Sequence, residues 1–240
     1  MPTIFELLDR FSFMQGYPAA YGVLLTAVII FMIHEWRLTL FALSLQYIIA
    51  GLLFVEVLDP RLASVKVLTG LFVCLILAIT GRPRHGNRLL EDVTEAEAAW
   101  LRRVRGIGAG KEVRISAALL RLFVTAMMVL AVWTLAQRPE IRLPAVGGEL
   151  GHMKLAIFTL AGMGLLGAAW TSDPLRSGVG VLMFLSGFEL YYYALEQSVA
   201  MLFSLAAVNF VVALVIAYLT QAYYQVTDLI EDQESSLEGS

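Results

Sequence analysis

The sequence predicts an all-α fold in which about seven helices cross a membrane as a polytopic bundle. Hydrophobic residues make up 59% of the 240 residues and charged residues only 15%, and the mean hydropathy is +0.75. A soluble domain of this length could not bury so much apolar surface. Apolar segments also recur along the chain, each with a length close to the roughly 20 residues that a helix needs to cross a bilayer. These observations indicate an integral membrane protein surrounded by lipid.

Seven segments have the length and apolar character of membrane-spanning helices. They run over residues 19–35, 38–58, 62–81, 115–137, 154–171, 176–195 and 198–221. The first three form a predicted unit over 19–81, the last three form another over 154–221, and the span 115–137 connects them. In each unit the turn between the first and second helices carries an arginine, and a glutamate lies near the end of the second helix. A parallel repeat of two three-helix units is therefore one hypothesis for the architecture.

Three further segments lie outside the predicted spans. Residues 1–18 fit a short helix that lies on the bilayer surface, with a frayed terminus as the alternative. Residues 82–114 form a basic cytoplasmic loop, in which the capping box TEAE starts a short helix. This helix carries Arg102, Arg103 and Arg105. We interpret these arginines as a topology determinant, with docking of anionic lipid or a cytosolic partner as the alternative. Residues 222–240 are acidic and polar, which predicts a disordered tail.

The basic residues predict the orientation in the membrane. Ten lie on the side of the 82–114 loop, including Arg37 and Arg176 in the short turns, and five lie on the opposite side. Because positively charged loops remain in the cytoplasm, we expect the N-terminus outside and the C-terminus inside. Arg121, near the inner end of the fourth span, is expected to extend its side chain to the interface. The net charge of −3 argues against nucleic acid as a partner.

Glu189 is the most unusual residue of the predicted spans. It lies in the sixth span, in FLSGFELYYYALEQ, somewhat past the middle of the bilayer. A carboxylate at this depth is costly, and such residues usually face the bundle interior and mark an ion or proton route. The alternative is a neutral carboxylic acid that links helices by hydrogen bonds. Residues 191–193, all tyrosines, and Glu196 follow toward the outer surface, where an aromatic belt is the ordinary explanation of tyrosines.

Lys66, in the third span, is the second unusual charge. Its amine either extends to the membrane surface or is a buried base that holds or passes a proton. Glu56 and Asp59 are candidate ion partners. Gln46 and Asn209 lie near the middle of the membrane, where an amide more often links two helices than forms part of a pathway.

The sequence offers no catalytic, cofactor or metal site. His34 is the only histidine within a predicted span, and His85 and His152 are placed in loops, so paired haem ligands and metal clusters are not expected. No nucleophile has a base beside it at a useful spacing. The single cysteine, Cys74, cannot form an intramolecular disulfide. We therefore expect no autonomous catalysis.

Two parts of the chain resemble known membrane subunits. The run RSGVGVLMFLSGFELYYYALE resembles subunit K of respiratory complex I and the C subunit of multisubunit cation/proton antiporters. With RLTLFALSLQYIIAGLLF and ASVKVLTGLFVCLILAITGR in the first half, the chain resembles component E of hydrogenase-4-type complexes. Where subunit K usually has a second carboxylate in its final helix, this chain offers only Asn209.

The resemblance implies a non-catalytic membrane subunit of an ion- or proton-translocating complex in a bacterial or archaeal cytoplasmic membrane. Such a subunit packs beside larger antiporter-like subunits and contributes polar residues to a proton pathway. Those residues would be Glu189, Lys66, Gln46, Asn209, Glu56 and Glu196. Two alternatives stay open: a scaffolding subunit of an unrelated membrane complex, and a small transporter that acts alone.

Overall fold

The computed structural model describes residues 16–238, except 34, 82–110, 142, 145, 147–149 and 172. For residues 111–117 and 225–238 it describes the backbone only. Seven helices and no strand occur in the described part of the chain. The helices are α2 Tyr17–Met32, α3 Trp36–Val55, α4 Pro60–Thr80, α6 Lys111–Gln137, α7 Gly151–Trp170, α8 Pro174–Leu195 and α9 Val199–Glu238. Six are long and apolar enough to cross a membrane, and α2 is a shorter apolar helix. The predicted class, a helical transmembrane bundle, is confirmed.

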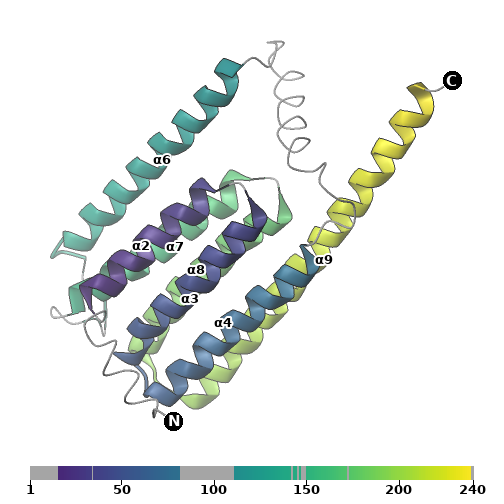
Figure 1. Ribbon diagram of the computed structural model, residues 1–240. Coiled ribbons are helices and arrows are strands. Elements are labelled where there is room, and N and C mark those ends of the chain that lie inside the picture. The colour runs from purple at the N-terminus through teal and green to yellow at the C-terminus, as the bar shows by residue number, and fades with distance from the viewer. Residues whose placement is uncertain are drawn as a thin grey trace, which may run out of the picture.

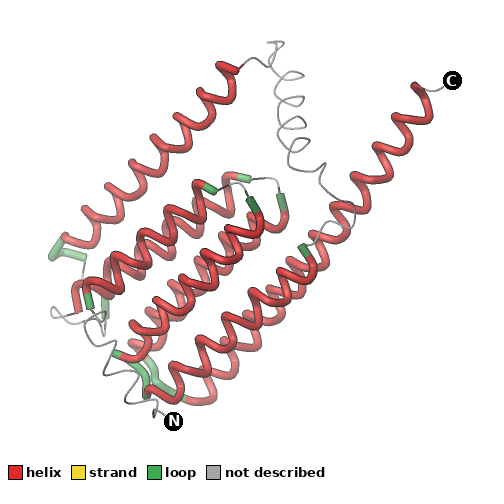
Figure 2. The backbone as a smooth tube through the Cα atoms, viewed as in Figure 1, coloured by secondary structure: helices red, strands yellow, loops and turns green. Residues whose placement is uncertain are grey.

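The helices form two packed groups of three (Figure 1). In the first, α2 contacts α3 and α3 contacts α4, and in the second, α7 contacts α8 and α8 contacts α9. The groups meet through α2 with α7, α3 with α8 and α4 with α9. Helices at the same position in each group are thus neighbours, and the repeat of the two units stays a prediction. Short connections join α2 to α3 and α7 to α8 at one end of the bundle, and α3 to α4 and α8 to α9 at the other (Figure 2).

The helix boundaries follow from local chemistry. Proline stands in the first turn of α4 and of α8, where its missing N–H needs no partner. The Asp173 side chain caps α8 by accepting a hydrogen bond from the Leu175 N–H at 3.1 Å. The turns at 33–35 and 171–173 lie at one end of the bundle, called the Arg37 end, and the turn at 56–59 lies at the other, called the Glu56 end.

Two boundaries differ most from the sequence prediction. Helix α6 begins at Lys111 instead of residue 115, and α9 continues to Glu238 where we expected a disordered tail over 222–240. The sequence from Val199 to Glu238 contains no glycine and no proline, so nothing in it terminates the helix. The predicted surface helix in residues 1–18 lies outside the described residues, apart from its last three positions. The short loop helix with Arg102, Arg103 and Arg105 also lies outside them.

Glycines bring α7 and α8 into the closest contact of the bundle. A Cβ atom added at Gly180 would lie 2.3 Å from the Ala168 nitrogen, and one at Gly164 would lie 2.4 Å from the Phe184 nitrogen. Backbones can approach this closely only where a side chain is missing, as is common between membrane helices. The contact fixes the rotation of α8, and therefore which of its side chains face the interior.

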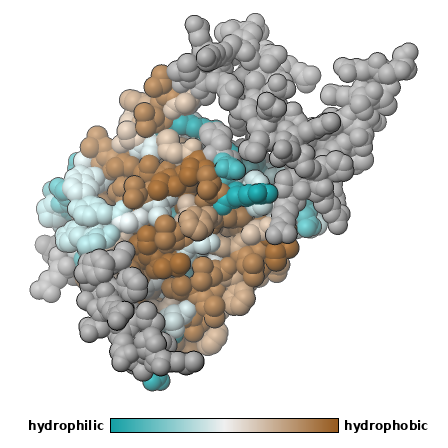
Figure 3. Space-filling model, viewed as in Figure 1, coloured by the Kyte–Doolittle hydropathy of each residue, from teal (hydrophilic) through white to brown (hydrophobic). Residues whose placement is uncertain are grey.

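The outer surface is broadly apolar. Figure 3 shows hydrophobic side chains over much of the visible face, and large residues such as Phe41, Ile79 and Phe203 are more than 60% exposed. Helix α6 packs at the edge of the bundle against α7 and α2, and only 11% of its apolar window is buried. Such a surface is stable in lipid rather than in water, so the protein is an integral membrane protein.

Candidate functional site

The central feature of the bundle is a buried ion pair between α4 and α8. The Lys66 Nζ contacts the Glu189 Oε2, and each side chain is only 2% exposed. Lys66 is therefore buried, and its amine does not extend to the membrane surface. Glu56 and Asp59 are not its partners, and the suggestion that they pair with Lys66 is wrong.

Asn209 on α9 completes this arrangement. Its Nδ2 donates a hydrogen bond of 2.7 Å to the Glu189 Oε1, and the residue is 2% exposed. One carboxylate thus holds an ammonium on one oxygen and an amide on the other. We call these three residues, Lys66, Glu189 and Asn209, the charge triad. It joins three helices from both groups of the bundle.

Helical periodicity explains why these side chains face inward. Ser186, Glu189 and Tyr193 are spaced i, i+3 and i+7 along α8, which places them on one face of the helix, and all three are buried. On α4, Lys66 shares the buried face with Thr69 and Gly70. A Cβ atom at Gly70 would lie 2.4 Å from the Tyr47 ring, so this glycine admits the tyrosine of α3 beside α4.

The triad has further polar neighbours. Tyr47 on α3 and Tyr193 on α8 are further buried polar side chains of the interior. Among the described residues their two hydroxyls, the Asn209 Oδ1 and both amide atoms of Gln46 are buried without a hydrogen-bond partner. Buried polar groups are normally bonded to protein or to ordered water.

The arrangement can hold a proton, and either member of the ion pair can carry it. With the proton on Lys66 the pair is charged, and with the proton on Glu189 both groups are neutral. Taking two ions out of water costs several kcal/mol each, and their attraction repays this only with good geometry and further hydrogen bonds. A buried pair is therefore weak evidence of a stabilising role. Among the described residues no group of three His, Cys, Asp or Glu side chains could hold a metal ion.

A second polar cluster at the Glu56 end was not foreseen. His152 lies in the first turn of α7 rather than in a loop, because α7 begins at Gly151 instead of residue 154. Its Nε2 lies 2.5 Å from the Glu56 Oε2, and the Gly16 N–H donates to the Glu56 Oε1 at 2.8 Å. No local sequence pattern predicts this pairing, because the histidine and the glutamate are 96 residues apart.

The remaining predicted residues fall in different places. Gln46 is buried on α3, whereas Glu196 is exposed at the end of α8. Tyr193 is fully buried, and its ring meets Phe54 edge to face at a centroid distance of 5.7 Å. The aromatic-belt interpretation is therefore wrong for Tyr193, because the face of α8 that carries Glu189 also carries this tyrosine inward.

Comparison with known proteins adds no identification. No protein-family model, no curated protein and no solved structure matches this chain. The resemblance to hydrogenase-4 component E and to subunit K stays a prediction. The proposed function therefore depends on the charge triad.

Proposed function

We propose that the protein is a membrane subunit of an ion- or proton-translocating complex, and that its charge triad is a proton-relay site. The observation that carries this proposal is the ion pair of Lys66 and Glu189, whose side chains are each 2% exposed. Charged side chains inside a membrane are rare, and those that face the bundle interior mark ion and proton routes.

The surroundings of the ion pair support a relay. Proton transfer needs donors and acceptors linked by side chains or water, and the unpaired polar atoms of Gln46, Tyr47, Tyr193 and Asn209 supply them. If the resemblance to subunit K is real, the second carboxylate that this family usually has in its final helix is missing here, and that helix offers only Asn209. In this chain a lysine on α4 takes the role of the second titratable group. The exposed end residue Glu196 and the hydrogen-bonded Glu56 are secondary candidates for proton entry or exit.

The proposal includes a location and partners. Positive charge gathers at the Arg37 end of the described bundle and in the 82–114 loop, which favours a cytoplasmic position for that end, with the N-terminus outside and the C-terminus inside. We infer a bacterial or archaeal cytoplasmic membrane. Larger antiporter-like subunits are the proposed partners, and the exposed apolar faces of the helices offer surface for them as well as for lipid.

The test is proton or cation coupling in vesicles that contain the native complex. We expect Glu189→Gln to leave assembly intact and to impair coupling severely, because a glutamine cannot exchange a proton. The double variant Lys66→Met/Glu189→Gln carries no unpaired buried charge and provides a second test if the single variant assembles poorly. The exposed carboxylate variant Glu140→Gln, outside the proposed pathway, is the matched control. Full coupling in an assembled Glu189 variant would refute the relay.

A scaffolding role is the second candidate, because the triad also ties α4, α8 and α9 together. In that case Glu189→Gln would weaken assembly and leave coupling per assembled complex unchanged. Native purification with mass spectrometry separates both from a transporter that acts alone. Antiporter-like chains should co-purify with a relay subunit, whereas a lone transporter would run as a single stable species.

A further inference from the structure

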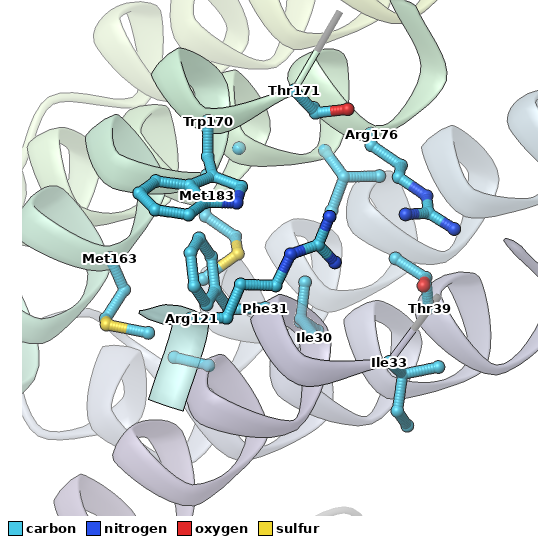
Figure 4. Close-up of a pocket in the computed structure, with 14 residues that line it drawn as sticks. Ile30, Phe31, Ile33, Thr39, Arg121, Met163, Trp170, Thr171, Arg176 and Met183 are labelled. Carbon is cyan, nitrogen blue, oxygen red and sulfur yellow. The ribbon is translucent and has the colours of Figure 1, made fainter. Parts of the chain in front are cut away.

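A cavity at the Arg37 end of the bundle brings two arginines together. Its volume is about 40 Å³, which is room for roughly three water-sized groups. Arg121 enters from α6 and Arg176 from the first turn of α8. Figure 4 shows both guanidinium groups on the side of the cavity that carries Thr39, with the rings of Phe31 and Trp170 on the other side.

The charge of this cavity is positive. Asp173 is the acidic residue nearest to Arg176, and its Oδ2 lies 3.6 Å from the Arg176 Nε. The same carboxylate already caps α8 through the Leu175 N–H. Among the described residues that line the cavity are these two arginines and no acidic side chain. Guanidinium groups bind phosphate oxygens with two parallel hydrogen bonds, so a pair of them suits a phosphate group.

The position of the cavity matches the depth of lipid headgroups. It lies where α2 and α7 end and α3 and α8 begin. Trp36 and Trp170 lie at this same end, and tryptophan is enriched at the boundary between hydrocarbon and water. Basic pockets between membrane helices bind the phosphates of anionic lipids.

Helix α6 also leaves space for acyl chains beside the cavity. Around Arg121 its apolar side chains are not covered by the bundle, since Leu119 is 59%, Leu122 57% and Phe123 62% exposed. A ligand with a phosphate and long hydrocarbon chains could place the phosphate between the arginines and its chains along these residues. Free phosphate would use only the polar part.

We propose that Arg121 and Arg176 form a binding site for the phosphate of an anionic phospholipid, held between α6 and the rest of the bundle. The phosphate of the bound lipid then occupies the cavity between Arg121 of α6 and Arg176 of α8. This site is independent of the charge triad and of its proposed proton relay.

The experiment uses the full chain in zwitterionic detergent–lipid micelles, titrated with phosphatidylglycerol or phosphatidylcholine. Lipid retention is measured by native mass spectrometry, and affinity by the shift in melting temperature. We expect tight binding of phosphatidylglycerol alone, with roughly tenfold weaker binding for each of Arg121→Gln and Arg176→Gln, since a charge-assisted hydrogen bond to phosphate is lost. Arg37→Gln is the matched control, because Arg37 lies at the same end over the Trp36 ring, outside the cavity.

Several results would overturn the proposal. Equal affinity for the two lipids would do so, as would unchanged phosphatidylglycerol binding in the double glutamine variant. Stabilisation by inorganic phosphate, lost in that variant and not enhanced by lipid, would assign the site to the free ion instead. If the glutamine variants do not fold, Arg121→Lys and Arg176→Lys keep the charge and remove the two-point contact. Unchanged lipid selectivity in this lysine pair would also count against the site.

Discussion

The ion pair inside the bundle makes a quantitative prediction about stability. Lys66→Met leaves the Glu189 carboxylate buried with only the Asn209 amide as a donor. Breaking a buried ion pair by removing one partner costs about 3–5 kcal/mol, because a charge stays uncompensated. With each side chain only 2% exposed, neither water nor salt screens the remaining charge. We expect the Lys66→Met loss to fall in this range.

The partner substitutions complete a double-mutant cycle. Glu189→Gln should cost a similar amount, about 3–5 kcal/mol, since the Lys66 ammonium then stays buried without its carboxylate. The double variant has no buried charge, so it should be more stable than Lys66→Met, by about 2 kcal/mol or more. Glu196→Gln, an exposed carboxylate at the end of the same helix, should change little.

The assay is reversible denaturant unfolding in mixed micelles, followed by circular dichroism. Each of the four proteins is measured in the same lipid and detergent, so differences in unfolding free energy refer to one reference state. Additive losses in the double variant would refute the reasoning, because two groups that form an ion pair must show coupling. A Lys66→Met protein as stable as the wild type would show that the carboxylate is solvated or neutral without its lysine.

Two further predictions concern packing and the polar cluster at the Glu56 end. Gly180→Ala places a Cβ 2.3 Å from the Ala168 nitrogen and should force α7 and α8 apart at a cost of about 1–3 kcal/mol or more. Gly167→Ala, whose nearest contact would be 3.6 Å, should be tolerated in the same unfolding measurement. His152→Phe removes the hydrogen bond to the partly buried Glu56 and should cost about 1–2 kcal/mol. A loss no larger than that of an exposed substitution would show that this bond is not formed.

The sequence alone determined the class of the protein and most helix positions. Hydropathy is a property of each segment by itself, so the length of the apolar runs located the helices to within a few residues. Where the prediction differed, local features were misjudged: α9 contains no residue that ends a helix before Gly239, and α7 begins early enough to include His152. The sequence also identified Glu189 and Lys66, because a charge inside an apolar run needs no fold to be noticed.

Only the tertiary structure decided which of these residues meet. Lys66 could have paired with Glu56, its nearer neighbour in the chain, but Glu56 contacts His152 and Lys66 contacts Glu189. The partner of a side chain depends on how each helix is rotated about its axis, and the close contacts at Gly70, Gly164 and Gly180 set that rotation. These contacts join helices far apart in sequence, and no local pattern encodes them. The sequence identified the candidate polar residues, and the packing of the helices determined which of them pair.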